Sequence, residues 1–395
     1  LPPAGRGRVR VMSAAGSRLG LYIHWPYCAR ICPYCDFNVY KAANAAPDAL
    51  VEAMLADLAA WTDRIGRRPL ASVHFGGGTP SLMEPSAIAA ILERADALFG
   101  LEPGAEIGLE ANPNEADRFK GLASAGIERL SLGVQALDDA SLKALGRDHD
   151  AAAGLAAFEA ARGRFSRVSL DLIYAREGQS PADWEQELRR ALALQPDHLS
   201  AYQLTIEPGT AFQKRLDRGD LVPPVEDAAA DMFEITQDLT DAAGLPAYEI
   251  SNHARSAAHQ SVHNRLYWEG ADWIGIGPGA HSRVGSAQGG GRLAAEAARR
   301  PADYIAGAAA GRAQSIETLS PRDEAVERTL MGLRLVEDGI TPARIEALTG
   351  VAIDMESAVG LCVQGVLNEG PGGRLHLTRR GRIFADRVAE MVAPV

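Results

Sequence analysis

The chain has 395 residues, of which 47% are hydrophobic and 23% are charged. This length and composition allow one large domain with a buried core and a smaller second domain. No stretch reaches the roughly 18 to 20 consecutive apolar residues of a membrane span, and residues 1–19 lack the apolar segment of a secretory signal. A net charge of −11 without a dense run of Lys or Arg argues against general nucleic-acid binding. We therefore expect a cytoplasmic protein, with residues 1–17 as a flexible N-terminal extension.

The first two thirds of the chain alternate short apolar runs with amphipathic stretches. Strands are predicted at residues 19–25, 72–75, 106–110, 129–134, 167–174 and 198–204. Helices are predicted between them, at residues 48–64, 85–99, 138–145, 151–162 and 183–194. Strands separated by helices of this length form parallel sheets through crossover connections. The pattern predicts an α/β fold over residues 18–250, a partial TIM-like barrel of six strand–helix units, with an open doubly wound sheet as the alternative.

The pattern changes after residue 250. Residues 251–318 are interpreted as a connecting segment that includes an Ala-rich helix. The last unit, residues 319–395, is predicted to hold helices at 323–337, 341–348 and 355–367, a hairpin at 370–377 and a final helix at 381–391. Helices with a two-stranded wing are typical of a winged-helix-like domain, a shape that often binds DNA. The only exposed basic run expected in this unit is three arginines near residue 380, which does not support that use.

Three of the four cysteines lie within eight residues, in the segment Cys28-Ala-Arg-Ile-Cys-Pro-Tyr-Cys35. In a chain without an export signal, such clustering favours a metal site over disulfides. Three thiolates from one loop can hold three irons of a cubic [4Fe–4S] cluster, which leaves the fourth iron open for an outside ligand. In radical SAM proteins that ligand is S-adenosylmethionine (SAM). A zinc site completed by His24 is the alternative, and the distant Cys362 is expected to be a core residue.

Groups that could contact such a cofactor fall at the ends of predicted strands, where barrel enzymes build their sites. The run Phe75-Gly-Gly-Gly-Thr-Pro80 follows the second strand, and a glycine backbone can approach a ligand closely. Glu110 could bind an ammonium group or ribose hydroxyls, and Arg147 could pair with a carboxylate. Asp171 interrupts an apolar strand and needs a polar partner, for which a ligand hydroxyl is a candidate. Taken alone, each of these residues is as easily structural, so their shared location is what favours a binding site.

With these motifs the chain resembles the radical-SAM coproporphyrinogen dehydrogenase-like family over roughly residues 18–395. The resemblance implies a [4Fe–4S] cluster on the three clustered cysteines, Cys28, Cys32 and Cys35. It also implies that Tyr22 contacts SAM and that Tyr34 lies against the adenine. Further SAM contacts are implied for Gly77, Gly78, Thr79, Glu110, Gln135, Arg147 and Asp171.

Two features place the resemblance in the heme-chaperone branch of that family. Enzymes of the family carry a further cysteine two positions after the third, where this chain has Phe37. The heme-chaperone branch carries a His-Asn-x-x-Tyr-Trp motif, present here as His263-Asn-Arg-Leu-Tyr-Trp268 and called the HNxxYW segment below. Imidazole is a common axial ligand of heme iron, and aromatic faces suit a porphyrin plane. His263, Tyr267 and Trp268 are therefore heme candidates, with a structural turn as the alternative.

The resemblance leaves two main functional hypotheses. In the first, the protein is a heme chaperone that binds heme and passes it to acceptor proteins, respiratory hemoproteins among the candidates, with the cluster and exchangeable SAM as a switch or assembly aid. In the second, it is an oxygen-independent coproporphyrinogen III dehydrogenase that decarboxylates propionates through a 5′-deoxyadenosyl radical. Action on another tetrapyrrole is a third option, and Phe37 with the HNxxYW segment favours the first. The heme ligand (His253, His259 and His281 also compete), the electron donor and the choice between monomer and homodimer stay open.

Overall fold

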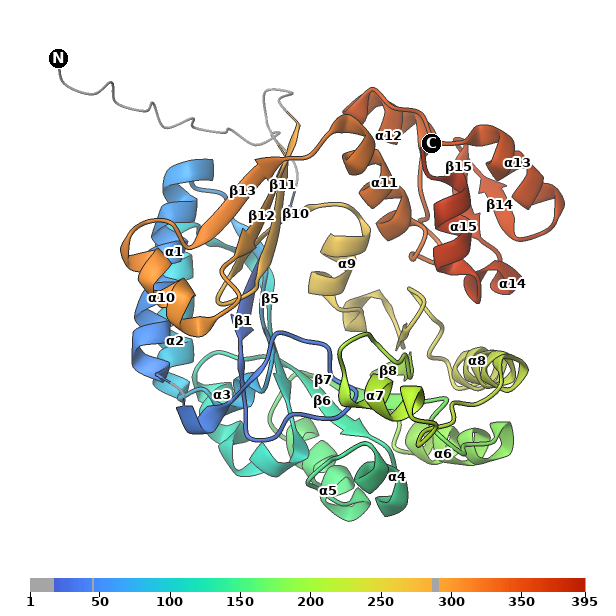
Figure 1. Ribbon diagram of the computed structural model, residues 1–395, viewed down its shortest axis with the longest axis horizontal. Coiled ribbons are helices and arrows are strands. Elements are labelled where there is room, and N and C mark those ends of the chain that lie inside the picture. The colour runs from blue at the N-terminus through green and yellow to red at the C-terminus, as the bar shows by residue number, and fades with distance from the viewer. Residues whose placement is uncertain (1–17, 45, 286–290, 395) are drawn as a thin grey trace.

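The computed structural model describes residues 18–44, 46–285 and 291–394. The predicted N-terminal extension, residues 1–17, lies outside the described residues. Within them the main sheet has the strand order β13-β12-β11-β10-β1-β4-β5-β6-β7-β8-β9. Figure 1 shows this sheet curled into an open barrel with helices along its outer side. None of the helices in the described ranges combines the length and apolar character that a bilayer crossing requires.

The six predicted strands are present and lie side by side in chain order, each parallel to the next. They are β1 (Leu19–Trp25), β4 (Leu70–Gly77), β5 (Leu101–Ala111), β6 (Arg129–Gln135), β7 (Arg167–Tyr174) and β8 (His198–Gln203). Their apolar side chains form one large core; Ile23, for example, pairs with Phe75 on one side and with Ile276 on the other. The prediction of a partial barrel of parallel strands is therefore confirmed.

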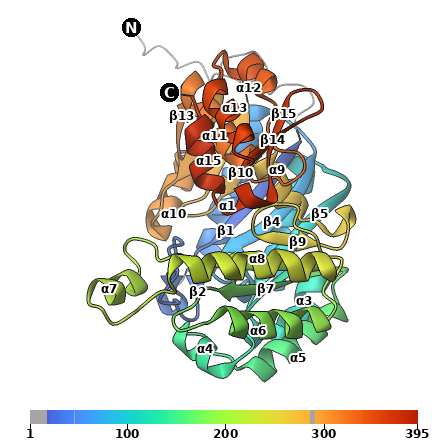
Figure 2. The same cartoon turned by 90° about the vertical axis from the view of Figure 1, so that its right-hand side faces the viewer.

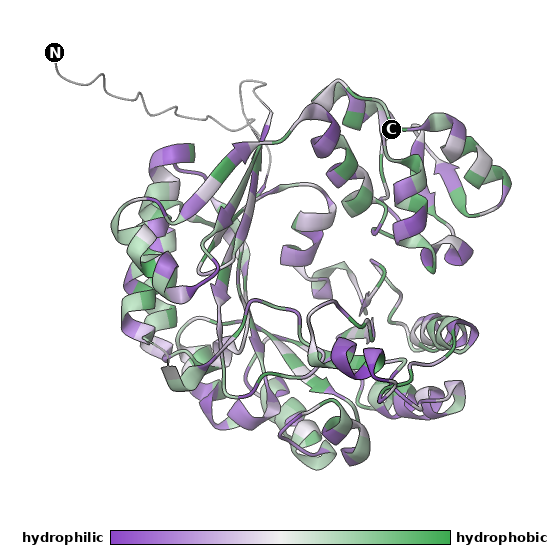
Figure 3. Ribbon diagram, viewed as in Figure 1, coloured by the Kyte–Doolittle hydropathy of each residue, from purple (hydrophilic) through white to green (hydrophobic). Residues whose placement is uncertain are grey.

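Helices connect these strands and cover the outer face of the sheet (Figure 1). They are α1 (Pro47–Ile65), α2 (Pro85–Leu98), α3 (Phe119–Ser124), α4 (Asp139–Ala144), α5 (Ala151–Arg162) and α6 (Pro181–Ala193). After β8 follow α7 (Ala211–Asp217), which projects away from this layer (Figure 2), and α8 (Glu226–Ala242), which packs on α6. Hydrophobic and hydrophilic residues alternate along them, as Figure 3 shows, because one side of each helix meets the core. Capping residues fix where two of these helices begin. The side chains of Asp150 and Ser180 accept hydrogen bonds from backbone N–H groups in the first turns of α5 and α6. Helices α6 and α8 run side by side beyond β8 (Figure 2).

Residues 251–318 differ from the predicted connector, because most of this segment joins the sheet. It supplies β9 (Asn252–Ala254), β10 (Asp272–Ile276), β11 (His281–Gly285), β12 (Arg292–Ala297) and β13 (Gln314–Thr318), with the helices α9 (Val262–Trp268) and α10 (Pro301–Ala309). Strand β10 extends the parallel set next to β1, and β11 to β13 follow in antiparallel order. Helix α9 lies inside the curve of the sheet, against β1, β4 and β10.

The C-terminal unit has its own hydrophobic core and the predicted order of helices and wing. It contains α11 (Pro321–Gly332), α12 (Pro342–Thr349), α13 (Met355–Val363), the hairpin β14 (Leu367–Gly370) and β15 (Arg374–Leu377), then α14 (Arg379–Arg382) and α15 (Ala385–Val392). The first and third helices end four to five residues earlier than predicted, and the final helix is split in two. Arg379 forms ion pairs with Glu234 and Asp238 on α8, so one of the exposed arginines is used between the two units.

Candidate functional site

A cavity of about 390 Å³ lies at the carboxyl ends of the parallel strands. Loops that follow strands in such a barrel meet at this end, which explains why residues far apart in the sequence converge there. All of the predicted cluster and SAM positions except Tyr22 line it. They are Cys28, Cys32, Tyr34, Cys35, Gly77, Gly78, Thr79, Glu110, Gln135, Arg147 and Asp171.

The cysteine loop is held at both ends and at its middle. Cys28 ends the short strand β2 (Tyr27–Cys28), which pairs in parallel with β3 (Tyr40–Lys41) beyond the loop. Between them, the N–H of Cys35 donates to the carbonyl of Cys32 at 3.2 Å. A small separate core supports the middle of the loop, because the N–H of Phe212 on α7 donates to the carbonyl of Pro33 and the Phe212 ring contacts that of Tyr34. The three sulfurs therefore enter the cavity from a fixed loop.

The thiols of this loop suit iron better than free reactivity. Burial raises the pKa of Cys28 and raises that of Cys35 to about 11. A thiol with such a pKa loses its proton at neutral pH only when a cation takes the proton's place, as iron does. A nucleophilic role, which needs a lowered pKa, is therefore not supported for Cys28 or Cys35.

The zinc alternative lacks a ligand set among the described residues, where no three His, Cys, Asp or Glu side chains gather closely enough to hold a single ion. His24, the fourth zinc ligand considered above, has both ring nitrogens engaged. Its Nδ1 lies 3.1 Å from the hydroxyl of Tyr22, and its Nε2 lies 3.0 Å from the carbonyl of Asn38. A cubic cluster does not need the sulfurs to meet at one point, because it holds its three thiolates on separate irons.

The glycine run packs so tightly against the cysteine loop that side chains would not fit. A Cβ atom at Gly78 would lie 3.0 Å from the sulfur of Cys28, and one at Gly77, whose φ is +105°, would lie 2.6 Å from the ring of His24. The N–H groups of Gly78 and Thr79 donate to carbonyls at the start of the loop, at 2.7 and 2.9 Å. The glycines thus let the second strand's end and the cysteine loop close around one cavity.

Arg147 reaches from the end of the fourth strand–helix unit to the sulfurs. Its Nη1 donates to Sγ of Cys32 at 3.3 Å, and its Nη2 donates to the carbonyl of Gly133 and to Oδ1 of Asn112. Its Nε has no partner among the described residues. A guanidinium beside a thiolate and beside a cavity can bind a carboxylate in its plane.

Asp171 and Gln135 are placed by the strands themselves. Ser131 and Ser169 donate to the two oxygens of Asp171 at 2.8 and 2.7 Å, and burial raises the pKa of this carboxyl group. Gln135 ends β6 with a φ of +70°, a left-handed conformation that is rare outside glycine and that often marks functional sites. Both residues line the cavity together with the three cysteines.

The HNxxYW segment lies elsewhere, on α9 inside the barrel, and does not line this cavity. His263 is 1% exposed, and both of its ring nitrogens are hydrogen-bonded, to Ser72 and Tyr267. Trp268 packs under the guanidinium of Arg334, whose central carbon is 4.8 Å from the ring centroid. The structure therefore shows the segment as a helix inside the barrel, in which His263 is buried and hydrogen-bonded, whereas Tyr267 and Trp268 are half-buried.

Some cavity residues were missed by the sequence prediction. Asn112 caps the turn after β5 and donates from Nδ2 to the hydroxyl of Thr79 at 3.2 Å. It stands in the same Leu-Glu-Ala-Asn motif as Glu110, so its position next to a chosen residue was the available signal. Ser131 and Tyr202 also line the cavity, from β6 and β8. Strand alternation would have placed both inward, but their residue types carry no distinctive chemistry.

Comparison with known proteins agrees with this geometry. Residues 22–191 match the model of the Radical SAM superfamily. The heme chaperone HemW of Mycobacterium tuberculosis is 36% identical over 379 residues, which cover 94% of this chain and 94% of that protein. The chain belongs to the HemW family of radical SAM proteins.

Other matches extend this result. The mouse protein "Radical S-adenosyl methionine domain-containing protein 1, mitochondrial" is 41% identical over 273 residues, which cover 68% of this chain. The chain spans only 62% of the length of that relative. The structure of coproporphyrinogen III oxidase (HemN) from Escherichia coli superimposes with a TM-score of 0.79 over 95% of this chain and 90% of that chain, at 22% identity. The fold of the whole described chain, C-terminal unit included, is thus a known one.

Membership in the radical SAM superfamily implies a [4Fe–4S] cluster and SAM as cofactors, and the cavity fits both. Three thiol groups face it from one loop, glycines open it, and acidic and basic side chains stand at its wall. A cluster bound there would supply an electron for reductive cleavage of the S–C5′ bond of SAM, the chemistry of the superfamily. The three cysteines would hold the cluster, and the acidic and basic side chains at the wall, Glu110, Arg147 and Asp171, would face the charged ends of SAM.

Proposed function

We propose that this protein is a heme chaperone that binds heme and transfers it to acceptor proteins, with a [4Fe–4S] cluster and exchangeable SAM. The observation that carries the proposal is the match to the heme chaperone HemW of Mycobacterium tuberculosis along 94% of both chains. The likeness to coproporphyrinogen III oxidase, at 22% identity, concerns the fold alone. It therefore adds no weight to porphyrinogen oxidation.

In this proposal Cys28, Cys32 and Cys35 hold the cluster, and the groups around them bind SAM. Arg147 pairs with the SAM carboxylate, since its guanidinium stands beside Cys32. Glu110 accepts from the ammonium group or the ribose hydroxyls, because its side chain is 41% exposed toward the cavity.

Exposed apolar side chains at the cavity give heme a surface on which to lie. Ile31, Phe37 and Tyr202 line the cavity and are 38%, 60% and 43% exposed. Apolar and aromatic faces that are open to water gain free energy when a flat apolar ligand covers them. Phe37 stands at the position where the family's enzymes have a further cysteine, so the phenylalanine adds apolar surface at the cavity where those enzymes have a thiol.

The histidines of the chain differ in their access to a heme iron. Six of the nine are buried, His263 among them. His281 is exposed, and His259 and His376 are half-buried. In the arrangement described here, the imidazole of any of these three histidines is accessible to an outside ligand. The imidazole of His263 would become accessible only if α9 moved.

The proposal is tested by two assays on one anaerobically reconstituted sample. Titration with heme should give a Soret band that saturates at a stoichiometric ratio, and incubation with SAM and coproporphyrinogen III should yield no protoporphyrinogen. Nonspecific or substoichiometric heme binding would overturn the chaperone function. Formation of protoporphyrinogen at a catalytic rate would replace it by the dehydrogenase function.

Single replacements of the histidines then locate the heme ligand. We expect His281→Ala, His259→Ala or His376→Ala to shift the Soret band, with His253→Ala as a buried control that leaves it unchanged. Loss of heme binding in His263→Ala alone would show instead that α9 opens to admit heme.

A further inference from the structure

The carboxylate of Glu110 is held from two sides at the floor of the cavity. Its Oε2 accepts a hydrogen bond from the N–H of Gly77, and its Oε1 lies 3.3 Å from Nε2 of His74. With the carboxylate oxygen as acceptor, Nε2 of His74 is the donor in this contact. The side chain of His74 is 9% exposed, whereas that of Glu110 is 41% exposed. His74 therefore supports Glu110 from the buried side.

His74 has little freedom to leave this position. It lies on β4 opposite Gly108 of β5, and a Cβ atom at Gly108 would sit 2.7 Å from its Nδ1. This nitrogen has no hydrogen-bond partner among the described residues. The ring is thus held by its hydrogen bond to Glu110 and by packing, in a space that glycine at position 108 leaves open.

The HNxxYW segment supplies that packing. The ring of His263 stacks on the ring of His74, with centroids 4.9 Å apart and planes inclined by 18°. Nδ1 and Nε2 of His263 lie 2.8 Å from the hydroxyls of Ser72 and Tyr267, so this ring cannot rotate. Burial lowers the pKa of His263 well below its usual value, which leaves the ring neutral at neutral pH.

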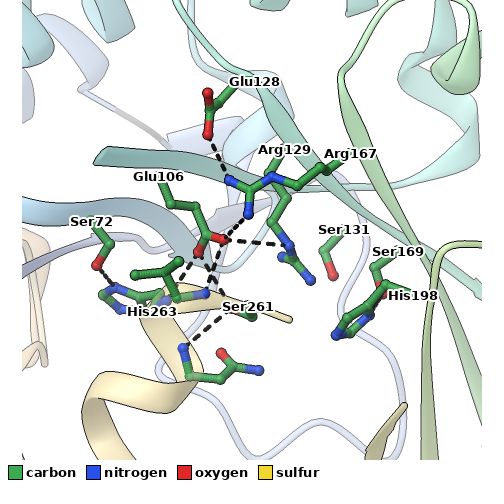
Figure 4. Close-up of polar contacts among 12 residues, drawn as sticks. Ser72, Glu106, Glu128, Arg129, Ser131, Arg167, Ser169, His198, Ser261 and His263 are labelled. Carbon is green, nitrogen blue, oxygen red and sulfur yellow. Dashed lines mark hydrogen bonds and ion pairs between the residues drawn. The ribbon is translucent and has the colours of Figure 1, made fainter. Parts of the chain in front are cut away.

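The backbone of the same segment is fixed as well. The N–H groups of Val262 and His263 donate to the buried carboxylate of Glu106, each at 3.0 Å (Figure 4). The ring of Tyr22 stacks near both histidines, 6.4 Å from His74 and 6.1 Å from His263. The stack of three rings thus fills the barrel between α9 and Glu110.

We propose that His74, stacked on His263, is a positioning residue that fixes the Glu110 carboxylate for binding SAM. The HNxxYW segment then acts on the SAM site from inside the barrel, through packed rings, whether or not it ever contacts heme. Tyr22, expected to contact SAM, supports the same stack. The inference rests on the proposed function only in that Glu110 binds SAM.

The experiment measures SAM affinity of the reconstituted full-length protein by equilibrium dialysis, together with iron and sulfide content. His74→Phe keeps a ring in the stack but removes the donor to Glu110, and should weaken SAM binding about tenfold, the effect of one hydrogen bond to a charged group. His74→Gln keeps an N–H donor at a similar reach and should restore affinity to within about threefold of the wild type. His253→Phe replaces another buried histidine away from the cavity and should leave SAM affinity unchanged.

A spectroscopic signal separates positioning from simple loss of structure. Addition of SAM should change the electron paramagnetic resonance spectrum of the reduced cluster in the wild type and in His74→Gln. In His74→Phe the same spectral change should require a higher SAM concentration. Equal SAM affinity in His74→Phe and wild type overturns the inference, as does failure of His74→Gln to restore binding. If the wild-type protein binds SAM but no heme, the proposed heme-chaperone function is wrong and the inferred role of His74 is unaffected. A wild-type protein that holds its cluster but binds no SAM overturns both.

Discussion

The parallel strands carry polar side chains at both ends of the barrel's inner face, and the two ends differ in what these side chains contact. At the carboxyl ends, Glu110 and Asp171 border a cavity together with the three sulfurs. At the amino ends, Glu106, Ser169 and His198 are 0%, 0% and 3% exposed and bonded within the protein (Figure 4). One end is open to ligands, and the other is closed by the protein's own groups.

Strand β5 shows the difference within five residues. Glu106 and Glu110 stand four positions apart, so strand alternation turns both to the same inward face. Burial alone would raise the pKa of Glu106, but Arg129, Arg167 and two backbone N–H groups lower it below its usual value. Among the described residues, Glu110 has only His74 and the N–H of Gly77 as hydrogen-bond partners. Of two glutamates on one strand, Glu106 is thus a buried ion-pair centre and Glu110 is open to the cavity, because neighbouring elements bring different side chains to them.

The largest expected effect concerns the open end. Cys32→Ala should abolish the cluster, because the two remaining thiolates leave two of the four irons without a protein ligand and do not hold the cube stably. The measurement is iron, sulfide and visible absorbance after anaerobic reconstitution. Cys362→Ala removes the one cysteine outside the loop and should keep full iron content. If iron and the visible absorbance survive Cys32→Ala, the three-cysteine site is wrong.

The next effect concerns the closed end. Glu106→Ala leaves the guanidinium groups of Arg129 and Arg167 and the start of α9 without their shared acceptor. The free energy of unfolding in urea should fall by about 3–5 kcal/mol, as for other buried ion pairs broken on one side. Glu128→Ala is the matched control, since Glu128 pairs with the same Arg167 but is 41% exposed, and should cost at most about 1 kcal/mol. Equal losses in the two variants would contradict the closed-end description.

Much of the open end was predictable from the sequence, because its residues follow strand ends and strand order is set by crossover connections. The cysteine spacing, the glycine run and Arg147 could be placed in one site before any coordinates. The closed end was not predictable in this way. Glu106 carries the same local signal as Glu110, and only the arrival of Arg129 and Arg167 from the next strands distinguishes them.

Two further differences have local causes. Strand β12 (Arg292–Ala297) reads Arg-Leu-Ala-Ala-Glu-Ala, a composition that favours a helix, and it is a strand because β11 and β13 pair with it on both sides. His263 belongs to residue types that bind heme, but a residue type does not reveal burial. The two residues that hydrogen-bond to its ring nitrogens are Ser72, which lies on β4, and Tyr267, which lies one turn later on α9.

A smaller effect tests whether Asp171 belongs to the open end. Asp171→Ala should weaken SAM binding about tenfold while leaving the cluster in place, because it removes a carboxyl acceptor from the cavity wall. Asp57→Ala is a suitable control: Asp57 is a buried aspartate that accepts from Tyr304 and Gln314 at the outer helix α1. It should change stability without changing SAM affinity. Unchanged affinity in Asp171→Ala would assign this residue to the closed network of serines instead.

The smallest effect is a pH dependence that arises on the closed side. His253, on β9 opposite the start of β8, is fully buried, and burial with the nearby Arg382 lowers its pKa to about 4. In the unfolded chain the His253 imidazole binds a proton near pH 6.5, whereas in the folded protein it stays neutral at this pH. The free energy of unfolding therefore falls as pH falls below about 6.5.

Between pH 7 and pH 6 this one residue should cost about 0.7 kcal/mol. Because pH 6 lies well above the pKa of the folded state, the cost depends almost entirely on the unfolded value. His253→Phe should therefore unfold with a correspondingly flatter pH dependence than the wild type, measured by urea denaturation at both pH values. Parallel curves would mean that the β9 imidazole already takes up its proton in the folded protein, and that this part of the barrel admits water as the cavity end does.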